Sequence, residues 1–183
     1  MCGIAGLFAY GANAPPIAQQ ALLAMRDQML ARGPDGAGSW VAEDQRIGLA
    51  HRRLAIIDLS DSAAQPMASE SGASVLTFNG EIYNYRELRR GLEQNGVRFR
   101  TQSDTEVILS LYEREGIAML PRLRGMFAFA IWDARRRGLL LARDPRASSR
   151  SIFPTTARGL PWPRRSRPWS REGSTPRPIR LAR

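Results

Sequence analysis

A length of 183 residues gives room for one domain with a sizeable core, and a single cysteine excludes an intramolecular disulfide. The formal net charge of +10 would suggest nucleic-acid binding, but residues 1–145 carry 17 Arg against 16 acidic residues, whereas residues 146–183 carry ten Arg against Glu172 alone. No apolar run approaches the roughly 18 residues of a membrane span, and the N-terminus lacks the basic and apolar regions of a signal peptide, so a cytoplasmic protein is expected.

The first 145 residues predict short strands that alternate with helices, because apolar residues recur at strand spacing and at helical spacing in turn. In chain order we expect a strand from Gly3 to Ala9, a helix over about 16–31 and a tight loop from Arg32 to Gly36. Strands follow near 38–42, 46–51, 54–59 and 73–79, with a turn at Ser60-Asp61-Ser62. Then come a helix that ends near Asn95-Gly96, a third helix, and a hairpin formed by Met126 to Asp133 and Gly138 to Arg143.

Capping patterns mark the second and third helices. Asn84 with Glu87 is typical of an N-terminal cap, and either Ser103 or Asp104 would cap the third helix, which Gly116 ends. Such a pattern of elements favours antiparallel sheets with helices packed outside them.

Cys2 directly follows the initiator Met1, so removal of Met1 would give one residue both a nucleophile and a base. A thiol must lose its proton before it attacks a carbonyl carbon, and an α-amine with a pKa of about 7.7–8.0 can accept that proton near neutral pH. A lone cysteine is otherwise more often a small buried hydrophobic residue, and only the rest of the sequence decides between these interpretations.

Six short strings follow one another along the first 145 residues: Cys2-Gly3-Ile4, Arg32-Gly33-Pro34-Asp35-Gly36, His51-Arg52-Arg53-Leu54-Ala55-Ile56, Phe78-Asn79-Gly80-Glu81-Ile82-Tyr83-Asn84, Ser103-Asp104-Thr105-Glu106 and Arg124-Gly125-Met126-Phe127-Ala128-Phe129-Ala130. In this order they resemble class II glutamine amidotransferases, and the combination looks like the glutaminase domain of glutamine-hydrolysing asparagine synthetases. The resemblance covers residue 2 to about residue 145.

The resemblance implies an α+β fold, the four-layer αββα sandwich of antiparallel sheets found in N-terminal-nucleophile hydrolases, incomplete at its C-terminus. It also implies that residues 2–145 hydrolyse glutamine to glutamate and ammonia. ATP-dependent asparagine synthesis would belong to a synthetase domain that this chain lacks. We therefore expect no cofactor and no metal for this chain, with ATP and Mg²⁺ needed only by the missing domain.

For catalysis, the resemblance implies that Cys2 is the nucleophile, with its own α-amine moving the proton through a bound water. It places the oxyanion donors at the Asn79 side-chain amide and the Gly80 backbone N–H. Taken alone, Asn-Gly is also the commonest two-residue hairpin turn. His51 as a base paired with Cys2 is a weaker alternative, because the resemblance sets it beside a substrate-binding arginine.

For substrate binding, the resemblance implies that Arg53 pairs with the α-carboxylate of glutamine, while Glu81 and Asp104 hold its α-ammonium. Arg52 is the rival to Arg53, which we prefer because it directly precedes Leu54. Without the resemblance, each of these charged residues would be read as a solvated surface group, and Asp104 as a helix cap.

The segment 146–183 is rich in Arg and Pro and by composition predicts a disordered arm. A frameshift explains it better. The family pattern continues after Pro145 approximately as LGIKPLYF, and deleting one base from a GC-leaning coding sequence turns this string into the observed residues 146–153. A second match, ASEVKAL, lies in the same neighbouring frame of residues 162–169. We therefore expect a truncated, poorly stable product, and resequencing of the gene tests this.

Two alternatives to the glutaminase stay open. An inactive fragment could bind nucleic acid nonspecifically through its Arg-rich arm, with an affinity that falls steeply with salt. An asparagine-synthetase-like paralogue could pass ammonia to another acceptor. We expect glutamine as the partner, no membrane and no specific nucleic acid, and the sequence leaves the oligomeric state undetermined.

Overall fold

The computed structural model describes residues 2–10, 13–58 and 60–144. Its first sheet holds β1 (Gly3–Phe8), β2 (Gly36–Val41) and β3 (Ile47–Arg53) in the order β1-β3-β2, with all neighbours antiparallel. The register pairs Gly3 with Arg52, so Cys2 lies at the end of the sheet where β3 finishes.

The second sheet holds β4 (Met67–Ala68), β5 (Ser74–Ile82), β6 (Gly125–Asp133) and β7 (Gly138–Arg143) in that order, again antiparallel. β6 and β7 form the hairpin that the sequence predicts. β4 covers only the first part of β5, because its two residues pair with Leu76 and Val75 and leave the later residues of β5 without a strand on that side.

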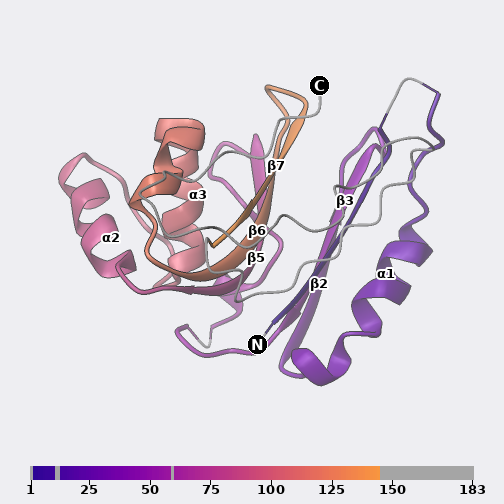
Figure 1. Ribbon diagram of the computed structural model, residues 1–183, viewed down its shortest axis with the longest axis horizontal. Coiled ribbons are helices and arrows are strands. Elements are labelled where there is room, and N and C mark those ends of the chain that lie inside the picture. Colours follow the sequence, from indigo (N-terminus) through magenta and orange to yellow (C-terminus); the bar gives the residue numbers. More distant parts are fainter. Residues whose placement is uncertain (1, 11–12, 59, 145–183) are drawn as a thin grey trace, which may run out of the picture.

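The two sheets pack face to face, and helices cover their outer faces (Figure 1). α1 (Gln19–Asp27) and the 3₁₀ turn η1 (Leu30–Arg32) lie against the first sheet, whereas α2 (Tyr85–Gln94), α3 (Asp104–Glu115) and η3 (Gly116–Arg122) lie against the second. The layers therefore run α1, first sheet, second sheet, α2 with α3, and the expected αββα sandwich is confirmed.

Three apolar clusters fill the three spaces between these layers. Burial of side chains that alternate along each strand supplies the main driving force for stacking the layers. Between α1 and the first sheet lie Leu22, Ala5, Leu7 and Ala50; between the sheets lie Ile47, Leu49, Val75, Ala130 and Trp132; and beneath α2 and α3 lie Leu88, Ile108, Leu111, Phe129 and Ile131.

The strand expected over 54–59 is wrong. β3 ends at Arg53, and Leu54 to Asp58 form a loop that runs toward the second sheet. The Ala55 N–H donates to the Asp35 carboxylate at 3.0 Å instead of to a neighbouring strand, and the Ile56 side chain is 69% exposed. Apolar residues occur here because the loop lines a cavity, and the sequence pattern does not distinguish this from a strand.

Helix starts differ in part from the expectation. α1 begins at Gln19, later than predicted. Asn84 precedes α2 but its side chain caps nothing: Nδ2 donates to the Arg122 carbonyl at 3.0 Å and Oδ1 accepts from the Arg124 N–H at 3.0 Å. Ser103 does cap α3, since its hydroxyl accepts from the Thr105 N–H at 3.1 Å.

The expected division at residue 145 stays a prediction, because the segment 146–183 lies outside the described residues. Within the described ranges, no helix is long and apolar enough to cross a membrane.

Candidate active site

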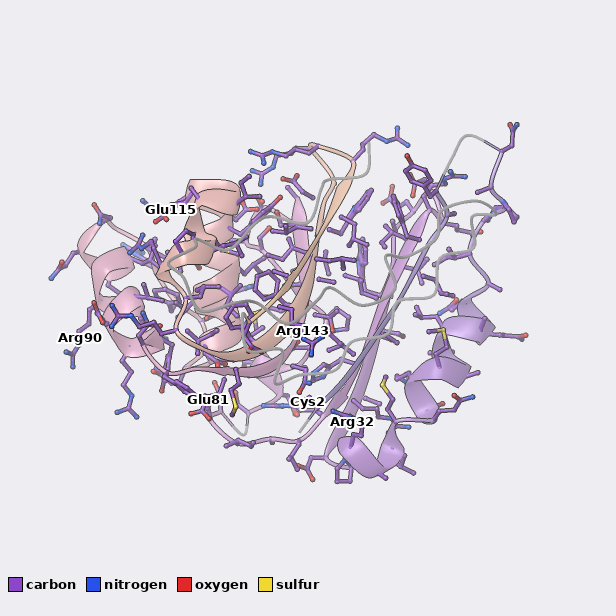
Figure 2. All side chains as sticks on the ribbon, in the orientation of Figure 1. Cys2, Arg32, Glu81, Arg90, Glu115 and Arg143 are labelled. Atoms are coloured by element: carbon purple, nitrogen blue, oxygen red, sulfur yellow. The ribbon has the colours of Figure 1, made fainter. Side chains whose placement is uncertain are left out.

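A cavity of about 150 Å³ opens where β1, β3 and β5 approach one another at one end of the two sheets. All six residues that the sequence predicts for the site line it, and they come from four separate segments of the chain. These residues are Cys2, Arg53, Asn79, Gly80, Glu81 and Asp104. Figure 2 shows Cys2 and Glu81 toward the same end of the molecule, Cys2 at the start of the first sheet and Glu81 on the second.

Cys2 is held by contacts with η1 and with the loop after β3. Its Sγ accepts a hydrogen bond from the Leu54 backbone N–H at 3.3 Å, and its carbonyl accepts one from Arg32 Nε at 3.3 Å. The thiol is half-buried. The thiol also donates to the Leu54 carbonyl at 3.5 Å, so both backbone polar atoms of Leu54 hold the sulfur.

The Asn79-Gly80 pair lies inside β5, opposite Ala128 and Phe127 of β6, so the hairpin-turn interpretation is wrong. Asn79 is only 2% exposed, and its Oδ1 has no hydrogen-bond partner among the described residues. Buried polar atoms are normally hydrogen-bonded, so an unpartnered amide oxygen in the interior indicates a role for Asn79 other than packing.

The backbone of β5 directs its N–H groups alternately to its two sides. Ala73 faces β6, because its carbonyl accepts from Ala134, whereas Ser74 faces β4, because its carbonyl accepts from Ser69. Even-numbered residues of β5 thus present their N–H groups to the edge that β4 leaves uncovered. Gly80 is one of them, so its N–H is directed into the cavity edge.

Only glycine fits at position 80. Its φ is +149°, and a Cβ atom there would lie 2.1 Å from the Met126 carbonyl oxygen and 2.7 Å from the Phe127 Cα. These neighbours are backbone atoms of β6 and cannot move aside as a flexible side chain could. The close approach of β5 to β6 therefore sets where the Gly80 N–H lies.

Arg53, rather than Arg52, lines the cavity, because successive side chains of β3 point to opposite sides. The Arg53 guanidinium donates to the carbonyls of Asp58 and, at 2.9 Å, of Ser60. Arg52 instead pairs with Asp27 of α1 at 2.6 Å. The preference for Arg53 over its neighbour is thus in keeping with the geometry.

Asp104 and Glu81 form the acidic side of the cavity. Asp104 is 4% exposed, and its Oδ2 accepts from the Ile82 N–H at 3.0 Å. Burial raises the pKa of Asp104 from 3.8 to about 6, with the nearby negative charge of Glu81 adding to the rise. Glu81 is exposed at the cavity mouth.

His51 does not line the cavity. It is 1% exposed between the sheets, and its Nε2 lies 3.1 Å from the Phe78 carbonyl, to which it must donate. Burial lowers the pKa of His51 to about 4, so the ring is neutral near pH 7. The pairing of His51 with Cys2 as a catalytic base is therefore wrong.

Leu54, Asp58, Gln65 and Thr105 are among the residues of the cavity wall to which the sequence gave no role in the site. Leu54 acts through its backbone N–H, which no side-chain pattern reveals. Asp58 accepts from the Gln102 N–H at 2.8 Å, and hydrogen bonds from Ser60 lower its pKa most. The described residues contain no cluster of three or more His, Cys, Asp and Glu side chains that could hold a metal ion.

Four layers with a cysteine at the start of the first strand, opening into a cavity between the sheets, define the N-terminal-nucleophile hydrolase class of fold. A solved structure of glutamine phosphoribosylpyrophosphate (PRPP) amidotransferase from B. subtilis, complexed with ADP and GMP, shares this fold. The TM-score is 0.61 at 23% sequence identity, over 80% of this chain and 37% of that one.

Sequence comparisons give the family. A model described as a glutamine amidotransferase domain matches residues 1–155. Asparagine synthetase (glutamine-hydrolyzing) 1 of Bacillus subtilis is 44% identical over 150 residues, which cover 79% of this chain and 23% of that relative. Amidase chry2 of Gibberella zeae is 36% identical over 163 residues, covering 85% of this chain and 24% of that relative.

The chain belongs to the glutamine amidotransferase domain family. It spans about a quarter of the length of the curated relatives it matches.

Proposed function

We propose that this chain hydrolyses the side-chain amide of glutamine to glutamate and ammonia, with Cys2 as the nucleophile. The observation that carries the proposal is that Cys2 shares one cavity with Asn79, with Gly80 and with side chains of both charges. The family supports glutamine as the substrate.

In the proposed reaction, the Cys2 thiolate attacks the amide carbon and forms a tetrahedral intermediate. Collapse of that intermediate breaks the C–N bond, and the nitrogen leaves as ammonia after accepting a proton. The α-amine of Cys2, exposed once Met1 is removed, takes the thiol proton and returns it to the nitrogen through a water. A second water then hydrolyses the thioester to glutamate.

The oxyanion would be stabilised by the Asn79 side chain and the Gly80 N–H. Both belong to β5, a central strand of the second sheet, so they stay in place while charge develops on the substrate oxygen. Their orientation requires no movement at the moment of reaction.

Glutamine itself would be held by its α-groups. The Arg53 guanidinium would donate two N–H groups to the α-carboxylate. In the structure these groups donate to the carbonyls of Asp58 and Ser60, and glutamine would replace those carbonyls as the acceptor. Asp104 and Glu81 would accept from the α-ammonium. A cationic ammonium beside Asp104 would favour the ionised carboxylate and offset part of its burial cost.

Three samples of the 183-residue chain test the proposal: wild type, Cys2→Ala, and a form that retains Met1. Mass spectrometry establishes the N-terminus of each, and ammonia release from glutamine measures turnover. We expect turnover only from the wild type with Met1 removed. Undiminished turnover in the form that retains Met1 would refute the role of the α-amine.

The fate of the ammonia belongs to the whole protein and is a further proposal. The similarity to asparagine synthetase supports ATP-dependent amidation of aspartate by a synthetase domain, which would require ATP and Mg²⁺. The similarity to Amidase chry2 keeps a different acceptor as the alternative. We expect the glutaminase step to need no cofactor, and a cytoplasmic location would keep the Cys2 thiol reduced.

A further inference from the structure

Phe78, the residue before the proposed oxyanion residues, is held by side chains at both its backbone N–H and its backbone carbonyl. The Phe78 N–H donates to Gln65 Oε1 at 2.6 Å, and the Phe78 carbonyl accepts from His51 Nε2 at 3.1 Å. A strand in a sheet normally satisfies these groups with a neighbouring strand. Here two side chains from elsewhere in the chain take that place.

The short β4 explains why. Its register with β5 pairs Met67 with Leu76, so Pro66 and Gln65 would next face Thr77 and Phe78. β4 begins only at Met67, so the backbone pairing of Gln65 with Phe78 is not made. The Gln65 side chain reaches the Phe78 N–H instead, and the edge beyond it stays open for the cavity.

The other end of the Gln65 amide binds the start of α3. Its Nε2 donates to the Thr105 hydroxyl at 3.2 Å. Next to Thr105, Asp104 accepts from the Ile82 N–H at 3.0 Å. The start of α3 is thus joined to β5 at Phe78 and at Ile82, on either side of the Asn79-Gly80 pair.

We infer that Gln65 is a positioning residue that fixes the oxyanion donors relative to Cys2, an inference that rests on the proposed glutaminase function. Gln65 holds β5 by Phe78, one residue before Asn79. Without it, the Phe78 N–H loses its side-chain acceptor and β5 can shift toward the open edge. An oxyanion donor displaced by a fraction of an ångström stabilises the transition state much less.

Loss of Gln65 should affect turnover more than substrate affinity. Arg53 is positioned by the end of β3, and Asp104 keeps its bond to Ile82. The helix start also keeps the Ser103 cap. The groups proposed to bind the α-carboxylate and α-ammonium of glutamine therefore have supports that do not pass through Gln65.

The test compares Gln65→Met, Gln65→Glu and Thr77→Val with the wild type in the full chain. Gln65→Met keeps the size of the side chain without a hydrogen bond. Gln65→Glu keeps an acceptor for the Phe78 N–H. Thr77→Val is the matched control, because it removes another buried hydrogen bond of β5, from Thr77 Oγ1 to the Ala50 carbonyl at 3.4 Å, and leaves the Phe78 peptide untouched.

We expect Gln65→Met to lower kcat by roughly 10- to 100-fold with KM for glutamine changed less than about threefold. Gln65→Glu should recover part of the loss. Thr77→Val should keep its kcat even if it unfolds at a lower temperature. The γ-aldehyde analogue of glutamine, which forms a tetrahedral adduct with a thiol, should bind Gln65→Met more weakly by about the factor lost in kcat.

A second measurement separates positioning from folding. In a Cys2→Ala background, the Kd of glutamine should be the same with Gln65 and with Met at position 65. Equal losses of kcat in Gln65→Met and Thr77→Val, or a rise in Kd that accounts for the effect, would overturn the inference. A wild-type chain without turnover would overturn the proposed function and this inference together, whereas an active wild type with an unaffected Gln65→Met would overturn only the inference.

Discussion

The Asp104 carboxylate accepts a hydrogen bond from the Ile82 backbone N–H at 3.0 Å and thereby joins the start of α3 to the end of β5. The same carboxyl is 4% exposed, and burial raises its pKa from 3.8 to about 6. A buried carboxylate that is ionised near neutral pH destabilises the fold. Such destabilising carboxylates are common in sites that bind a cation.

Asp104→Asn should therefore stabilise the chain at neutral pH. The folded pKa lies above the unfolded value, so the cost of ionisation is complete above about pH 6 and absent below about 3.8. A shift of this size corresponds to a gain of up to about 3 kcal/mol in the free energy of unfolding at pH 8. Denaturant unfolding at pH 8 and pH 4 measures it, and a difference that persists at pH 4 would contradict this explanation.

Glutamine binding should weaken at acidic pH, because a protonated Asp104 no longer attracts the α-ammonium. Calorimetric titration of the Cys2→Ala variant isolates binding from turnover. We expect the Kd to rise about five- to tenfold for each pH unit below 6, since glutamine itself does not titrate there. The Asp104→Asn variant should bind weakly at every pH, and a flat Kd between pH 7 and pH 5 in the parent would refute the assignment.

Gly80→Ala should lose both stability and activity. The added methyl group would meet backbone atoms of β6 and require a left-handed φ, at a cost of about 1–3 kcal/mol or more. Displacement of the position-80 N–H should lower turnover at least about 100-fold. Gly91→Ala is the control: it lies within α2 with open space around it and should stabilise by about 0.5–1 kcal/mol without a change in kcat.

Arg53→Lys should raise KM for glutamine, because an ammonium group cannot make the two parallel hydrogen bonds of a guanidinium with a carboxylate. Loss of one charge-assisted bond predicts a rise of roughly 10- to 100-fold. Arg52→Lys, a change of the same kind one residue earlier, affects an ion pair with Asp27 on the α1 side of β3 and should leave KM unchanged. Equal effects in the two variants would show that neither side chain binds the substrate.

Local patterns were sufficient for β1 and for the β6–β7 hairpin, because short-range spacing and turn residues determine these elements. They left Ser103 and Asp104 as alternative caps of α3, and the structure shows Ser103 as the cap. The loop after β3 was predicted as a strand because Ala55, Ile56 and Ile57 read as one. Hydrophobicity along the chain cannot distinguish a residue that packs in a core from one that lines a cavity, because both are apolar and only the core residue is shielded from solvent.

The sequence by itself determined the chemistry available: a cysteine at the second position, an Asn-Gly pair directly after Phe78, and charged residues in an order typical of glutamine amidotransferases. Only the tertiary structure decided that Arg53 and not Arg52 reaches the cavity, that His51 is buried away from it, that Asp104 is a buried carboxylate and not a helix cap, and that Gln65 holds the Phe78 peptide. The physical reason is that burial and hydrogen-bond partners depend on how two sheets and a helix pack, which brings together groups far apart in the chain.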